Sequence, residues 1–202
     1  INVVGASQVE SKGIKKGQIV DIEETVEATI ASVEAAERMA GYSIETAYVA
    51  IGGAHIRSEN SHGVVAISNP DSEITQSDID RVIEAASAIS IPTSREVVHV
   101  LPRGFVVDGE SGVRDPIGMS GVRLEVDTHL ISAGTSAIKH VRKAINEVGV
   151  NIEDLVFSGL ASAEACLTPT EKELGCVLID IGGGVTSIAA YLEGSLTYSG
   201  VI

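Results

Sequence analysis

The chain has 202 residues, 28 of them acidic and 14 basic, which gives a formal net charge of −14 at pH 7. Such an excess of carboxylates repels a phosphate backbone and excludes nucleic acid as a partner, and no apolar run approaches the roughly 18 to 20 residues that span a bilayer. Because 44% of the residues are hydrophobic but only 3% are aromatic, the core must be built from aliphatic side chains.

The first 54 residues predict two short strands, one helix and a third strand. The two short strands are the runs INVVGAS and GQIV. Asp21, followed by Glu24 three residues later, is a capping box, so a helix begins there, and Gly41 ends it. The segment SIETAYVAIGG then predicts a strand around Tyr48 to Ile51 that ends on two glycines.

Residues 55–132 have a different pattern and predict an inserted unit. HIRSENSHGVVAIS predicts an extended segment with a turn, and NPDSEITQSD a loop followed by a helix cap. Thr75 and Asp78 begin the helix, and Pro92 closes this part. Two long strands, EVVHVLPRGFVVDG and GVRLEVDTHLIS, follow. The order strand, helix, strand, strand has the size of a small domain.

The last 70 residues alternate between helices and strands. Thr135 begins a helix that Gly149 ends. A strand at DLVFSG, a short helix around SAEACL and a turn at TPTEKELG follow, and then three strands, CVLIDIG, SIAAYLE and SLTYSGV. This alternation is typical of an α/β scaffold.

The most specific local feature is the run LIDIGGGVTS. Its strand delivers Asp180 to the strand end, and Gly182, Gly183 and Gly184 then expose backbone N–H groups that anionic oxygens can approach, since no Cβ obstructs them. Asp180 is a candidate to hold hydrated Mg²⁺, and Thr186 to donate a hydroxyl. The alternative is a hairpin whose glycines only satisfy turn geometry. The strand-borne Asp and the following Thr favour phosphate binding.

This turn resembles the second phosphate loop of the actin, sugar-kinase and Hsp70 superfamily, which also lies at a β-hairpin. The resemblance implies that Asp180, Gly182, Gly183, Gly184 and Thr186 bind ATP, with Mg²⁺ held by Asp180 through water. Those proteins commonly carry a second Asp, which helps to order the metal and the attacking water, where this chain has Ser187. The resemblance therefore implies at most a weak ATPase, and we expect the segment alone to bind ATP weakly or not at all.

Further motifs along the whole chain resemble the FtsA family of bacterial cell-division proteins. They include SKGIKKGQIVDIEETVEATIASVEAAERMAG, AYVAIGGAHIRSENSHGVVAI, GVRDPIGMSGVRLEVDTHLI and EKELGCVLIDIGGGVTSIA. The resemblance implies an ATP-binding actin homologue that helps to anchor the FtsZ ring, polymerises with other FtsA protomers and recruits later division proteins. It implies a cytoplasmic protein, peripheral on the inner face of the membrane at the division site, whose main FtsZ contacts and membrane helix lie outside these residues.

The fold class implied is α/β, a partial actin-like (ribonuclease H-like) domain with an inserted strand-helix-strand-strand subdomain. We expect residues 1–54 and 133–172 to form part of the first actin-like subdomain, residues 55–132 the inserted interaction subdomain, and residues 173–202 the start of the second actin-like subdomain with the phosphate-binding hairpin. The first phosphate loop and the adenosine-binding motif are expected outside the chain, which would be a central segment of a longer protein.

Two other functions stay open within the same fold. One is a phosphotransferase, such as a sugar or acetate kinase, although Ser187 and the interaction-type insertion argue against it. The other is an actin-like assembly protein of a pilus or cell-shape system.

The histidines and cysteines of the chain are expected to have structural rather than catalytic or metal-binding roles. The five histidines lie on different elements without an HExxH pattern, which favours satisfied or surface histidines over a metal site. They are His55, His62, His99, His129 and His140. Cys166 and Cys176 predict free, buried thiols.

Two surface segments are candidates for protein contacts. Lys139, Arg142 and Lys143 predict a solvated helix face, with an acidic neighbour in a filament as the alternative. The loop RDPIGMSG places Arg114, Asp115 and Met119 on an exposed turn, which is either a contact site or ordinary turn chemistry.

Overall fold

The computed structural model describes residues 2–67 and 73–202, which form an α/β fold. The helices are α1 (Ile22–Ala40), α2 (Gln76–Ser87), α3 (Thr135–Val148), α4 (Ser158–Cys166) and α5 (Pro169–Leu174). The strands are β1 (Ile14–Lys15), β2 (Gln18–Ile19), β3 (Thr46–Ile51), β4 (Arg57–Ala66), β5 (Arg95–Val107), β6 (Glu110–Val113), β7 (Arg123–Gly134), β8 (Asn151–Phe157), β9 (Cys176–Ile181), β10 (Thr186–Leu192) and β11 (Ser195–Val201). None of these helices combines the length and apolarity that crossing a membrane requires.

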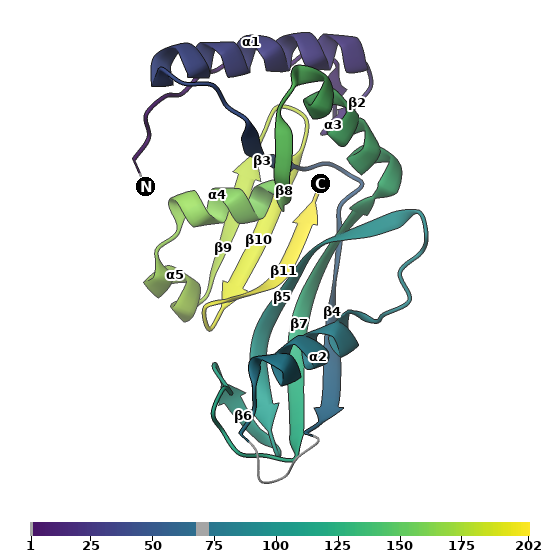
Figure 1. Cartoon of the computed structure of the whole chain (residues 1–202), viewed down its shortest axis with the longest axis vertical. Coiled ribbons are helices and arrows are strands. Elements are labelled where there is room, and N and C mark those ends of the chain that lie inside the picture. Colours follow the sequence, from purple (N-terminus) through teal and green to yellow (C-terminus); the bar gives the residue numbers. More distant parts are fainter. Residues whose placement is uncertain (1, 68–72) are drawn as a thin grey trace.

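The strands of this part of the chain are arranged in four sheets (Figure 1). The largest is antiparallel with the order β4-β7-β5-β6, and a second antiparallel sheet has the order β11-β10-β9. β3 and β8 pair in parallel, and β1 and β2 form a short hairpin. Figure 1 shows α1 and α3 at one end of the molecule and α2 against the largest sheet at the other end.

The predicted helix ends are confirmed where their capping residues were identified. The Asp21 carboxylate accepts a hydrogen bond from the Glu24 N–H at 3.0 Å, and Gly41 ends α1 with a left-handed φ of +83°. Gly149 ends α3 in the same way, with φ of +90°. Capping by near neighbours in sequence therefore marks these helix ends.

The predicted order strand, helix, strand, strand is confirmed over β4, α2, β5 and β7, and β6 adds a strand that the sequence did not predict. The turn predicted within HIRSENSHGVVAIS is wrong, because β4 runs unbroken from Arg57 opposite Ser132 to Ala66 opposite Arg123. Gly63 lies inside β4, where a Cβ would stand 2.4 Å from the Val82 carbonyl oxygen of α2. Residues 69–72 of the predicted loop lie outside the described residues.

Two apolar clusters form the core, and β7 contributes to both. One lies between α2 and the largest sheet and contains Ile67, Ile74, Ile79, Val82, Ala86, Phe105, Val107, Leu124 and Val126. The other joins β3, β7, β8, α3, α4 and the β10–β11 hairpin and contains Ile51, Ile56, Ile131, Ala133, Ile138, Leu155, Phe157, Ala163, Ala189, Tyr191 and Leu196. β7 therefore connects the inserted unit to the scaffold through continuous packing.

Three further local predictions are wrong. The run INVVGAS forms no strand over its described residues: Val3 and Val4 are 84% and 55% exposed, and no strand in the described part of the chain pairs with its backbone. TPTEKELG contains a helix, α5, rather than a turn, since Thr168 and Glu171 form a capping box. Both cysteines are free as predicted, but Cys166 is exposed rather than buried.

A chain of hydrogen bonds joins the inserted unit to β11. Asn60 donates to the Thr197 carbonyl at 3.3 Å, so its side-chain oxygen faces His129 Nδ1 at 2.7 Å and accepts from it. His129 Nε2 then accepts from the Ser199 hydroxyl at 2.9 Å. Burial, together with the nearby Arg103 guanidinium, lowers the pKa of His129 to about 4. His129 is therefore neutral at pH 7 and bonded through both ring nitrogens.

Acidification from pH 7 to pH 4 should destabilise the fold through His129. The unfolded chain takes up this proton near pH 6.5, whereas the folded chain takes it up only near pH 4. The lost free energy of unfolding is on the order of 2–3 kcal/mol. His129→Gln does not titrate, so urea unfolding should show a smaller loss for it over the same pH range. Equal losses in the two proteins would contradict this assignment.

Candidate functional site

The predicted phosphate turn connects two paired strands. β9 ends at Ile181 and β10 begins at Thr186, and these two residues are opposite each other in the hairpin. The Gly182 N–H donates to the Val185 carbonyl at 3.0 Å, which closes the turn. Gly182, Gly183 and Gly184 are exposed, so their backbone lies open to solvent.

Among the glycines of the turn, only Gly182 is crowded by the turn itself, since a Cβ there would stand 3.1 Å from the Val185 carbonyl oxygen. None of the three has a left-handed φ, whereas other turn glycines of the chain do. A Cβ on Gly183 would meet no atom within 4 Å, and one on Gly184 would make only ordinary contacts with Lys16. Turn geometry therefore gives a reason for Gly182 but none for Gly183 and Gly184, where close approach by a ligand is the better reason.

Asp180 lies one residue before the end of β9 and is held in place by α4. Its Oδ2 accepts a hydrogen bond from the Ser162 hydroxyl at 2.8 Å. No described residue donates to Oδ1, which can therefore accept from another donor, such as a water molecule of a hydrated Mg²⁺. The donor set, one carboxylate beside exposed backbone amides, fits the magnesium and phosphate chemistry predicted for this turn.

Thr186 and Ser187 face different surroundings. Thr186 exchanges backbone hydrogen bonds with Ile202 at 2.8 and 2.9 Å, so it anchors the turn to the end of β11. Counted from Asp180 along the superfamily pattern DxGGGTxD, Val185 holds the Thr position and Thr186 follows it. Ser187 is 3% exposed, and its hydroxyl lies 3.1 Å from that of Ser158, so the residue at the position of the second Asp points into the interior.

Two further turns, which no sequence motif connects with the site, lie beside the glycine turn. The tip of the β1–β2 hairpin, Lys16 and Gly17, packs against the Gly52–Gly53 backbone at the end of β3 and approaches Gly184. A cavity of about 300 Å³ with mainly apolar walls opens next to them, with Gly17, Gly52 and Val185 in its lining. The only sequence signal for this arrangement was the glycine in KKG and the glycine pair after β3.

Three of the five histidines, His62, His99 and His129, form hydrogen bonds through their rings, whereas His140 is exposed and the buried His55 Nδ1 has no partner among the described residues. His62 lies between Asp127 and Glu125, with ring nitrogens 2.9 and 3.0 Å from their carboxylates, and these hydrogen bonds raise its pKa. His99 Nε2 accepts from the Phe157 N–H at 3.0 Å, and burial lowers its pKa. Within residues 2–67 and 73–202, no group of three or more His, Cys, Asp or Glu side chains has the arrangement of a metal site.

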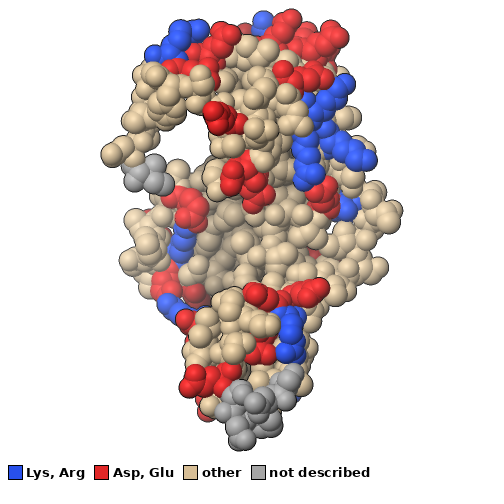
Figure 2. All heavy atoms as spheres, viewed as in Figure 1, with Lys and Arg blue, Asp and Glu red and all other residues tan. Residues whose placement is uncertain are grey.

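The basic residues of α3 lie on its exposed face, where Figure 2 shows Lys and Arg beside acidic side chains. Arg142 pairs with Glu96 at 2.8 Å, and Lys143 lies 3.7 Å from Glu147. Acidic neighbours from the same chain therefore partly neutralise this cluster, as expected of a solvated helix face.

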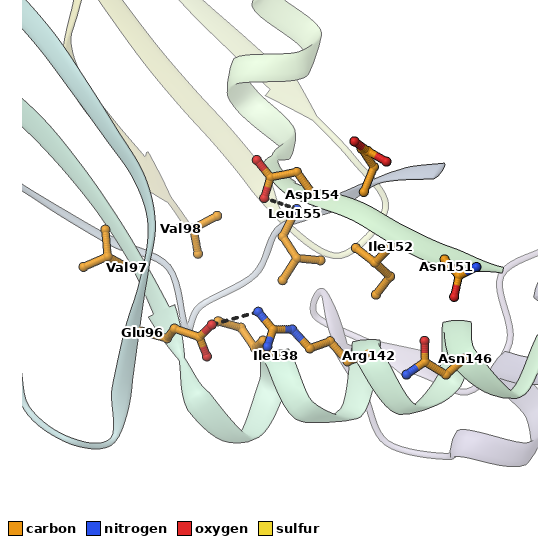
Figure 3. A pocket seen from close by; sticks show the side chains of 11 residues that line it. Glu96, Val97, Val98, Ile138, Arg142, Asn146, Asn151, Ile152, Asp154 and Leu155 are labelled. Carbon is orange, nitrogen blue, oxygen red and sulfur yellow. Dashed lines mark hydrogen bonds and ion pairs between the residues drawn. The ribbon is translucent and has the colours of Figure 1, made fainter. Parts of the chain in front are cut away.

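A groove of about 360 Å³ lies between β5, α3 and β8 (Figure 3). The Arg142–Glu96 ion pair lies beside it, and Asp154 accepts from the Leu155 N–H at 2.8 Å. None of the glycine turns contributes to its lining, so it is separate from the candidate phosphate site.

In the loop RDPIGMSG, Arg114 and Asp115 are exposed as predicted, and Arg114 pairs with Glu173 at 2.6 Å. The prediction that Met119 is exposed is wrong, because Met119 packs against the cluster beneath α2. The exposed apolar residue of the loop is Ile117.

Two sequence comparisons with known proteins both find similarity to FtsA. A sequence profile described as "SHS2 domain inserted in FTSA" matches residues 53–132. Over all 202 residues the chain is 45% identical to cell division protein FtsA of Pseudomonas aeruginosa, 41% to that of Bacillus subtilis and 36% to that of Escherichia coli. It covers 48%, 46% and 48% of these proteins, respectively, so the chain spans about half the length of the curated relatives it matches.

Among solved structures, the PilM-PilN type IV pilus biogenesis complex contains a similar chain. The TM-score is 0.63 at 15% identity, with 96% of this chain and 52% of that chain covered. This likeness is one of fold alone, and it confirms the predicted actin-like α/β class.

Proposed function

From the similarity to FtsA proteins over all 202 residues, we propose that this chain belongs to the FtsA family and supplies one wall of an ATP site, in which the turn from Gly182 to Gly184 binds phosphate oxygens. The observation that carries the proposal is the open space at Gly183, where neither φ nor any neighbouring atom requires a glycine. The amides of Gly183 and Gly184 make no hydrogen bond to another described residue, so both can donate to an anion.

The side chains next to the turn, Asp180 and Ser187, would have different roles in this site. Asp180, oriented by Ser162, would hold Mg²⁺ through water, and the metal would neutralise phosphate charge when bound. Ser187 offers no carboxylate to order an attacking water, and it is buried against Ser158. These residues favour nucleotide binding with slow turnover.

At the level of the cell, we propose the role that the names of the relatives indicate, namely cell division. The full-length protein would help to anchor the FtsZ ring at the inner face of the membrane, polymerise, and recruit later division proteins. The SHS2-like unit supports a contact role because it extends from the scaffold with its own apolar core (Figure 1). FtsZ and the membrane would be contacted mainly by parts outside these residues.

The two alternative functions have less support. A phosphotransferase would need a catalytic carboxylate, and the turn offers Ser187 where the superfamily commonly has Asp. The likeness to the pilus protein is one of fold at 15% identity, whereas the relatives that match at 36–45% are named as cell-division proteins.

Replacing Gly183 tests the phosphate turn directly. In the full-length protein, Gly183→Val should abolish Mg²⁺-ATP binding measured by calorimetry, because the side chain would occupy the space in which the phosphate lies. The melting temperature should stay close to that of the wild type. Gly104→Val is the matched control, since Gly104 in β5 is also without a left-handed φ and without a contact at its Cβ position. Unchanged ATP affinity in Gly183→Val would refute the proposal.

A second variant tests the contact role of the inserted unit. Asn60 and His129 lie opposite each other in the β4–β7 pair, so a two-residue turn can replace residues 61–128. This deletion removes the whole cluster beneath α2 and also β5 with its His99–Phe157 hydrogen bond, and it keeps the hydrogen bonds that join Asn60 and His129 to β11. We expect cooperative unfolding to persist and filament formation or partner recruitment to fail, as measured by electron microscopy and pull-down. Normal assembly by the folded deletion variant would count against the role.

A further inference from the structure

The tip of the β1–β2 hairpin lies directly against the glycine turn. The Cβ position of Gly184 is 3.5 Å from the backbone nitrogen of Lys16 and 3.6 Å from its Cα. On the other side, the Cβ position of Gly53 is 3.0 Å from the Lys16 carbonyl oxygen. Lys16 therefore occupies the space between the end of β3 and the candidate phosphate turn.

The position of this tip is fixed by backbone contacts. Lys16 and Gly17 both have positive φ, +50° and +70°, which makes a two-residue turn of the kind that suits a tight hairpin. Asn, Asp or Gly is preferred at the first of these positions, so a Lys there bears a conformational cost. At Gly17 a Cβ would stand 2.4 Å from the Gly52 carbonyl oxygen, so the tip cannot move towards β3.

The charge of Lys16 is available to a ligand. Its side chain is exposed, and the ion pairs found between described residues do not include it. The segment from Asp180 to Ser187 contains a carboxylate and no basic residue. Backbone amides supply only partial positive charge, whereas a triphosphate carries several negative charges. An ammonium group at this position meets that electrostatic need.

We propose that Lys16 is part of the phosphate site, where its ammonium group binds the phosphate oxygens that the amides of Gly183 and Gly184 contact. This inference rests on the proposed function, because it assigns a residue to the same ATP site. Lys15 is the natural comparison, since it is also exposed and basic but precedes the turn and pairs with Gln18 in the hairpin.

The test compares Lys16→Met, Lys15→Met and Gly183→Val in the full-length protein, with Mg²⁺-ATP as the probe and calorimetry as the readout. Lys16→Met should weaken binding about tenfold or more, because a charge-assisted hydrogen bond to phosphate is lost. Lys15→Met should bind within about twofold of the wild type, as expected for a charge outside the site. The affinity of Lys16→Met should also depend less on KCl concentration than that of the wild type.

The possible results distinguish the role of Lys16 from the existence of the ATP site at the glycine turn. Equal weakening by Lys16→Met and Lys15→Met would overturn a specific role for Lys16, since it would reflect the general charge of the hairpin. Normal binding by Lys16→Met, with loss of binding in Gly183→Val, would overturn the role of Lys16 and leave the glycine turn as the site. Normal binding by Gly183→Val would overturn the ATP site itself.

Discussion

The N-terminal β1–β2 hairpin is held against the rest of this protein by close backbone contacts. These contacts are made at glycines, where a Cβ would not fit. A Cβ on Gly13 would lie 2.3 Å from the Asp21 carbonyl oxygen, and one on Gly17 would lie 2.4 Å from that of Gly52. These contacts fix the hairpin to the start of α1 and to the end of β3, and they bring its tip to Gly184. The candidate site therefore depends on three segments far apart in sequence, because none of them alone places a basic residue beside the glycine turn.

The inserted unit and the candidate site share one strand. β11 accepts a hydrogen bond from Asn60 at Thr197 and donates one to His129 from Ser199, and three residues later Ile202 bonds to Thr186 at the base of the glycine turn. The polar atoms of this junction are mutually satisfied, which is the condition under which a buried polar network adds order. The inserted unit, which we propose contacts proteins, is thus joined through the hydrogen bonds of β11 to the glycine turn, which we propose binds nucleotide.

Much of the fold could be predicted from local chemistry. Asp21, Thr75, Gly41 and Gly149 define helix ends because capping is an interaction between near neighbours in sequence. INVVGAS failed as a strand because strand formation depends on a pairing partner that the pattern itself cannot supply. The glycine turn was found from its own sequence, whereas Lys16 was missed because its contact with Gly184 spans most of the chain and leaves no periodic signal.

The phosphate turn is tested most directly by amide NMR of the full-length protein, labelled at glycine and lysine, during titration with Mg²⁺-ATP. We predict that the N–H resonances of Gly183, Gly184 and Lys16 shift together and saturate at the same nucleotide concentration, while that of Gly104 in β5 stays in place. Saturable binding that shifts other resonances and leaves Gly183 and Gly184 unmoved would contradict the claim that this turn holds the phosphates.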